Sequence, residues 1–162
     1  MATIDVVILM GSASDLDHVR PAVLVLERLG MTARVRVTSA HRTPERTVQI
    51  IREAEADGAQ VFICAAGMAA HLAGVVASHT LRPVLGVPLP GGILDGVDAL
   101  LSTVQMPAGV PVATMSIGPA GATNAAVLAA RILGLSDVPI AAAVDAFIKK
   151  QTDDVLESAD LS

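Results

Sequence analysis

Three short polar clusters hold the residue types that could carry out chemistry in this sequence. Each cluster follows a run of aliphatic residues, and together they contain Ser12, Ser14 and Asp15, then Ser39, His41, Arg42 and Thr43, then Gly67 and His71. Hydroxyl groups and a guanidinium bind phosphate, and an imidazole exchanges protons near neutral pH. A carboxylate repels a phosphate placed directly against it and suits ribose hydroxyls instead. The combination favours a phosphoribosyl compound as the ligand.

Within these clusters, Arg42 and His41 are the strongest candidates for binding and catalysis. The guanidinium of Arg42, with the backbone amides and hydroxyls at the first two predicted helix starts, indicates an anion site. His41 lies in a loop between a strand and a helix, which favours a role in proton transfer. Ser14 is the expected cap of the first helix, and the alternative is that Ser14, Asp15 and Thr43 only cap helices and that His71 caps or packs against its own helix. His18 and His79 are expected to be surface or core residues.

The elements that must position these residues alternate between strands and helices. Strands are predicted at 5–10, 32–37, 60–65, 83–87 and 110–117. The first is a continuous aliphatic run that needs cover on both faces, which is typical of a parallel sheet wrapped by helices. The second contains Arg34 and Arg36, so we expect it at an edge. Because the carboxyl ends of parallel strands share one edge of a sheet, the three clusters can meet on one ligand.

Helices are expected from cap residues, glycine stops and apolar periodicity. The predicted ranges are 14–30, 43–57, a helix after the glycine turn that follows the third strand, 94–103, 122–133 and 138–156. Pro21 either kinks the first helix or begins its main part. This order predicts an α/β fold in one domain spanning 1–162: a three-layer, doubly wound parallel sheet of five strands, flavodoxin-like or Rossmann-like, with an additional C-terminal helix.

Composition argues against several classes of function. The formal net charge of −5 disfavours nucleic acid as a partner. The single cysteine, Cys64, allows neither a disulfide nor a cysteine metal cluster, which favours a reducing cytoplasm. Segments 61–81 and 101–130 carry no charged residue, but their glycines, prolines and polar groups argue against a membrane span, and no leader-like pattern opens the chain. Motifs of dinucleotide enzymes, P-loop proteins, zincins and serine hydrolases are missing from the sequence.

The predicted helix at 122–133 has alanine on every side and a single charge, Arg131. A helix that is apolar all round is buried all round. In one layer over a sheet, half of such a helix would face water, so we expect a subunit interface there. The alternative is an alanine-rich helix tolerated on the surface.

Motifs follow one another along nearly the whole chain: GSASD, SAHRTP, AGMAAHLAG, LGVP, DALLSTVQMP and GATNAAVLAARIL. In this order they resemble the PurE family, the N5-carboxyaminoimidazole ribonucleotide mutases of purine synthesis. The resemblance implies a homo-octamer with sites where subunits meet. It also implies a reaction without metal or cofactor, in which a carboxylate moves from the exocyclic nitrogen to ring carbon C4 of an aminoimidazole ribonucleotide. An ATP-dependent N5-carboxyaminoimidazole ribonucleotide synthetase is the partner that could hand over the substrate.

The resemblance assigns roles to residues by motif position. His41 matches the general acid and base of the family. The expected substrate-binding residues are Ser12, Ser14, Asp15, Ser39, Ala40, Arg42, Ala66, Gly67, Ala70, His71 and Leu72. Among them, Ser12, Asp15 and Arg42 match the nucleotide-binding residues, and residues 66–72 match the loop that closes round the carboxylate.

Departures from the family pattern leave alternatives open. Met68 and Ala73 stand where the family often has a glycine and a proline. Animal-type relatives, which are carboxylases that use CO2 directly, tend to have Lys-Gly where this chain has Arg42 and Thr43, which favours the mutase. A carboxylating enzyme of a nicotinate-derived cofactor pathway, usually with an additional domain, is a further rival. So is a non-catalytic nucleotide-binding module, although such a module needs no titrating group like His41.

Overall fold

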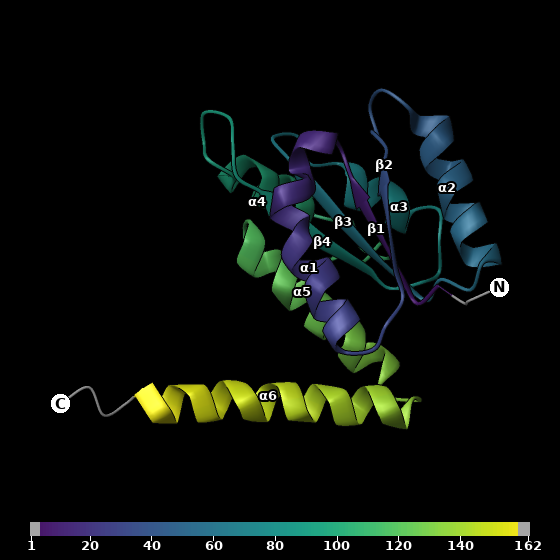
Figure 1. Ribbon diagram of the computed structural model, residues 1–162. Helices are drawn as coiled ribbons and strands as arrows, with labels where there is room; N and C mark the ends of the chain where they lie inside the picture. The colour runs from purple at the N-terminus through teal and green to yellow at the C-terminus, as the bar shows by residue number, and fades with distance from the viewer. Residues whose placement is uncertain (1–3, 159–162) are drawn as a thin grey trace.

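The structure, a computed structural model that describes residues 4–158, is organised around one parallel sheet (Figure 1). Its strands are β1 (Val6–Met10), β2 (Ala33–Val37), β3 (Val61–Gly67), β4 (Val84–Leu89) and β5 (Ala113–Thr114). They lie in the order β2-β1-β3-β4-β5, and every neighbouring pair is parallel. This confirms the predicted flavodoxin-like sheet and the edge position of the strand that carries Arg34 and Arg36.

Helices cover both faces of the sheet, which completes the three layers. They are the 3-10 turn η1 (Ala13–Asp15) and the helices α1 (Leu16–Arg28), α2 (Pro44–Ala56), α3 (Leu72–Ala77), α4 (Val97–Val104), α5 (Pro119–Leu133) and α6 (Val138–Ser158). Alternate residues of β1 enter two separate cores. Ile8 and Met10 pack with α1 and α5, whereas Val7 and Leu9 pack with α2 and α3. The continuous aliphatic run is therefore buried on both sides, as predicted.

Several predicted boundaries are wrong, most clearly at the fifth strand. β5 has only two residues, and Pro111, which offers no N–H to the ladder, lies outside it, as do residues 115–117. β4 instead continues through Pro88 to Leu89, and β3 reaches Gly67. Among the helices, α4 begins three residues later than predicted and α5 three residues earlier. The first helix runs without a break through Pro21.

The alanine-rich helix α5 is buried largely within the chain itself. It packs against α1 over most of its length, and α6 crosses its C-terminal end (Figure 1). Between Gly121 and Leu133, only Asn124 and Arg131 are exposed. The premise that half of this helix faces water in the protomer is therefore wrong, and its burial needs no second subunit. In α6, by contrast, only Val144 is buried.

A cation–π contact joins the last turn of α1 to the long C-terminal helix α6. The Arg28 guanidinium lies 5.4 Å from the centre of the Phe147 ring.

In the described part of the chain, no helix is both long enough and apolar enough to cross a membrane.

Candidate active site

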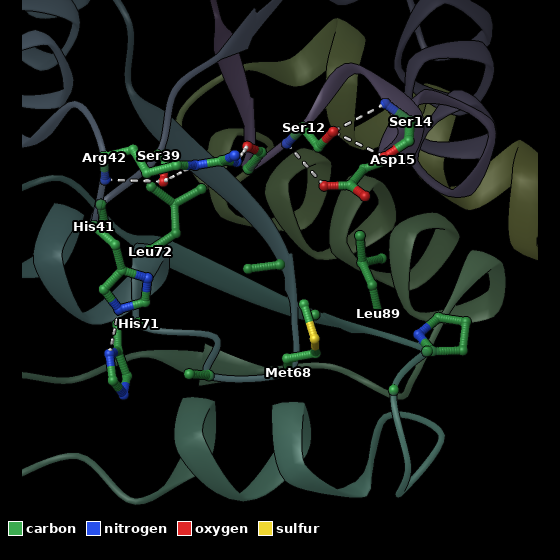
Figure 2. Close-up of a pocket in the computed structure, with 18 residues that line it drawn as sticks. Ser12, Ser14, Asp15, Ser39, His41, Arg42, Met68, His71, Leu72 and Leu89 are labelled. Carbon is green, nitrogen blue, oxygen red and sulfur yellow. Dashed lines mark hydrogen bonds between the residues drawn. The ribbon is translucent and has the colours of Figure 1, made fainter.

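The three polar clusters meet at one cavity of about 550 Å³ at the carboxyl edge of the sheet. Its walls come from the loops that follow β1, β2, β3 and β4 (Figure 2). Two of these strands, β1 and β3, are direct neighbours in the sheet. The predicted site residues that line it are Ser12, Ser14, Asp15, Ser39, Ala40, His41, Arg42, Ala66, Gly67, His71 and Leu72. Ala70 is the exception. Its side chain is buried and lies outside the lining.

The wall after β1 is a tight capped turn. Ser12 is the N-cap of η1, not Ser14 as predicted: the Ser12 hydroxyl accepts from Ser14 N at 3.3 Å and from Ser14 Oγ at 2.8 Å. Asp15 Oδ2 in return accepts from Ser12 N at 3.0 Å, which completes a capping box. The backbone amides of Ser12, Ser14 and Asp15 are therefore occupied inside the turn. The second carboxylate oxygen of Asp15 and the hydroxyl hydrogen of Ser12 remain for a ligand.

The wall after β2 supplies the positive charge of the site. Arg42 Nη2 donates to the carbonyl oxygen of Gly11 at 3.3 Å, and the Ser39 hydroxyl accepts from Arg42 N at 3.2 Å. These contacts lay the guanidinium across the ends of β2 and β1 (Figure 2). No salt bridge to Arg42 is present among residues 4–158. Its charge is therefore available to an anionic group in the cavity.

Thr43 does not line the cavity but stabilises the loop that forms this wall. Its hydroxyl accepts from Ser39 N at 3.0 Å and lies 3.3 Å from Thr38 Oγ1. Thr38 is buried and pairs in turn with Thr47 Oγ1 at 2.8 Å. The chain of hydroxyls fixes the loop between β2 and α2, which carries His41 and Arg42. Thr43 is the N-cap residue of α2 by position, but its side chain makes no capping bond.

Two histidines from different loops form a pair at the edge of the cavity. His41 Nε2 lies 2.8 Å from His71 Nδ1, and the rings meet edge to face at 74° with 4.9 Å between their centres. His41 comes from the loop after β2 and His71 from the N-cap of α3 (Figure 2). No sequence pattern predicts a direct contact between these two side chains.

Helix α4 holds the loop between β3 and α3 through the side chain of Ser102. Ser102 Oγ accepts from Ala70 N at 3.0 Å and lies 3.2 Å from the carbonyl oxygen of Met68, although the Asp98 carbonyl, at 2.8 Å, is the nearer acceptor for its hydrogen. The backbone amide of Ala70 therefore helps to fix the shape of the loop. Met68, which lines the cavity, has a φ of 53°, a conformation that favours glycine. The family glycine that Met68 replaces would adopt it without strain.

Sequence reasoning missed the wall that follows β4. Leu89, at the end of β4, and Pro90, Gly91 and Gly92 after it line the cavity. None of these side chains carries a reactive group, so a search for chemistry passes over them. Their position was nevertheless predictable, since they follow a strand of the same parallel sheet and must reach the same edge.

Other reactive groups lie away from the cavity. Cys64 is fully buried in β3, and burial raises the pKa of its thiol. Within residues 4–158, no group of three or more histidine, cysteine, aspartate or glutamate residues is arranged to hold a metal ion.

Comparison with known proteins identifies the family. The sequence matches the family described as AIR carboxylase over residues 5–154. It is 50% identical over 155 residues to the N5-carboxyaminoimidazole ribonucleotide mutase of Brucella melitensis, covering 96% of each chain. Identity to the mutase of Escherichia coli K12 is 49% over 155 residues, covering 96% of this chain and 92% of the other. The crystal structure of Treponema denticola PurE matches with a TM-score of 0.86 at 33% identity and covers 94% of each chain. The protein that carries this cavity therefore belongs to the AIR carboxylase family.

Proposed function

We propose that this protein is an N5-carboxyaminoimidazole ribonucleotide mutase of purine biosynthesis, with His41 as its general acid and base. The observation that carries the proposal is the meeting of His41, Arg42 and Asp15 at one cavity in a chain about half identical to named mutases. A non-catalytic binding module would need the charged groups but not the imidazole.

The polar groups of the cavity divide between the parts of a ribonucleotide. We assign the phosphate to Arg42 with the hydroxyls of Ser12 and Ser39, since a guanidinium beside hydroxyl donors suits a phosphate. Asp15 suits the ribose, whose hydroxyls can donate to the carboxylate. The heterocycle is then directed toward His41 and the loop after β3.

The reaction that we propose needs one group that gives and takes a proton. His41 donates a proton to the exocyclic nitrogen, the nitrogen–carboxylate bond breaks, and CO2 is released inside the cavity. The aminoimidazole is an enamine, so its C4 attacks CO2 and forms the new carbon–carbon bond without an electron-sink cofactor. His41 then takes the proton from C4 and returns to its starting state.

Small apolar side chains suit the retention of CO2 next to the ring. Ala66, Ala69 and Leu72 line the cavity, whereas Ala65 and Ala70 are buried behind it. A small dry pocket of this kind keeps the released molecule close to C4 and keeps water away.

Exposed apolar side chains support assembly into a homo-octamer, which we propose from the family resemblance. Ile93, Leu94, Val97, Leu101 and Val104 are exposed on the loop after β4 and on α4. This loop also contributes Gly91 and Gly92 to the cavity. Contact with further copies would remove this surface from water beside the site.

We also propose that the chain is a single catalytic domain that works in the cytoplasm and receives substrate from an ATP-dependent synthetase.

The direct test replaces the imidazole while keeping its size. His41→Asn should lower the rate of interconversion of the two carboxylated ribonucleotides by at least about 100-fold, because general acid–base catalysis contributes factors of this order. His79→Asn is the matched control, since His79 is exposed and outside the cavity. A His41→Asn variant that folds normally and keeps near-parent turnover would contradict the assignment.

Labelled carboxylate separates the mutase from a carboxylase that uses CO2 directly. The mutase should convert N5-carboxyaminoimidazole ribonucleotide carrying a 13C carboxylate into product that keeps the label in excess unlabelled bicarbonate. Product formed equally well from the uncarboxylated ribonucleotide and bicarbonate would favour the carboxylase. Binding of either nucleotide without turnover would favour a binding module.

A further inference from the structure

We propose that the side chain of Met68 covers the mouth of the cavity and determines how much of the released CO2 is recaptured at C4. This role rests on the proposed function, because the CO2 in question is the one that the proposed reaction releases. Met68 stands where the family often has a glycine, so the cover is a feature of this chain.

Met68 lies where the cavity opens and not at its floor. Its side chain lines the cavity, yet 62% of the residue is exposed. Leu72 and Leu89 line the same cavity and are buried. In the view of Figure 2, the Met68 thioether lies between the two histidines on one side and Leu89 on the other. A residue that both lines a cavity and faces solvent marks its mouth.

The Met68 side chain also joins the walls that follow β3 and β4. Gly67 and Leu89 are partners at the ends of these two strands, so the loops after them begin side by side. The loop after β4 then approaches Met68 closely: a Cβ built on Gly92 would lie 3.2 Å from Met68 Cγ. The methionine side chain therefore packs directly on the backbone of the opposite loop and fills the space between the two loops.

The backbone of Met68 adopts a conformation that favours glycine. Its φ of 53° costs a residue with a Cβ on the order of 1 kcal/mol. The carbonyl oxygen of Met68 accepts from Ala70 N at 2.8 Å, which holds the residue in this turn. Local backbone stability thus favours glycine at this position, and the methionine side chain is explained by what it does at the mouth.

A methionine suits a movable cover over a small apolar molecule. Its unbranched side chain has three rotatable bonds, so it can move aside for the nucleotide and close behind it. CO2 carries no charge, and its retention therefore depends on closed apolar walls. If CO2 escapes after the nitrogen–carboxylate bond breaks, the exocyclic nitrogen keeps the proton from His41, His41 regains a proton from water, and the uncarboxylated ribonucleotide is released.

The test measures how much of the consumed substrate becomes product. The probe is N5-carboxyaminoimidazole ribonucleotide with a 13C carboxylate, in excess unlabelled bicarbonate and corrected for decarboxylation without enzyme. Met68→Gly should consume substrate within about twofold of the parent rate, because His41 is unchanged, but should release about fivefold or more of the uncarboxylated ribonucleotide per labelled product. Met68→Ala should behave in the same way.

Two further variants serve as controls. Met68→Leu keeps the apolar volume and should keep the parent ratio of labelled product to consumed substrate. Leu24→Ala is the matched control for Met68→Ala, since Leu24 is 59% exposed on α1 and lies outside the cavity. It should leave the ratio unchanged.

Two results would overturn the inference. A parent-like ratio in folded Met68→Gly would show that the mouth retains CO2 without the side chain; glycine fits the left-handed backbone, so this variant keeps the test possible if Met68→Ala does not fold. A raised KM at an unchanged ratio would make Met68 a contact of the nucleotide instead. Failure of the proposed function is distinguishable, because the parent itself would then form its product from bicarbonate or form none.

Discussion

Asp15 has two roles, one in closing the turn after β1 and one in binding the ligand, and the substitution Asp15→Asn separates them. One carboxylate oxygen accepts from Ser12 N at 3.0 Å and closes the turn after β1. The other faces the cavity, where we place the ribose. An asparagine side chain keeps a neutral oxygen for the turn but removes the charge from the ligand contact.

The magnitudes follow from the loss of charge. A hydrogen bond to a charged group contributes about 1.5–3 kcal/mol and a neutral one about 0.5–1.5 kcal/mol, so each ribose contact weakens by about 1 kcal/mol. With two ribose hydroxyls, kcat/KM should fall by roughly 30-fold, since about 1.4 kcal/mol is a factor of ten. Asp15→Ala should add a loss of about 1 kcal/mol in unfolding free energy, because it also removes the hydrogen bond from Ser12 N that completes the capping box.

Steady-state kinetics and chemical denaturation measure the two effects on the same protein samples. Asp17→Asn is the matched control, since Asp17 is exposed in the first turn of α1 and lies outside the cavity. A kcat/KM for Asp15→Asn within twofold of the parent, with Asp15→Ala destabilised, would refute the ribose role and leave Asp15 as a cap alone.

Three further predictions concern charge, packing and backbone conformation. Arg42→Ala should weaken binding of the ribonucleotide and abolish its preference over the dephosphorylated nucleoside in calorimetry; an unchanged preference would rule out the phosphate role. Gly121→Ala should lower the unfolding free energy by about 3 kcal/mol, because its Cβ would collide with the Ser116 carbonyl; near-parent denaturation would show that the backbone relaxes. Met68→Gly should change stability by less than about 1 kcal/mol, since relief of the left-handed backbone offsets the freedom of glycine; a loss above 2 kcal/mol would contradict this.

The sequence was sufficient to predict the sheet and the edge where the site lies. Strand burial and the Arg34–Arg36 edge pattern depend on local apolar periodicity, which the chain displays directly. The gathering of polar clusters follows from parallel topology alone. Strand ends were harder to predict. Pro111 has no backbone N–H to donate, so the extent of β5 depends on which residues near it can still pair with β4.

Side-chain pairing inside the cavity could not be predicted in the same way. The contact between His41 and His71 joins loops from different strands, so it depends on the path of each loop. Ala70 is expected to contact the ligand by motif position, yet its backbone N–H donates a hydrogen bond to Ser102 Oγ and its side chain lies in the interior. Gly91 and Gly92 gave no chemical signal, although topology places them at the rim.

A crystal structure of the protein with its carboxylated aminoimidazole ribonucleotide bound would test the central claim most directly. We expect the phosphate against Arg42, the ribose hydroxyls against Asp15, and ring carbon C4 with its carboxylate beside the His41 imidazole. A ribonucleotide bound outside the cavity, or bound within it with the phosphate against His41 and the heterocycle at Arg42, would contradict the account.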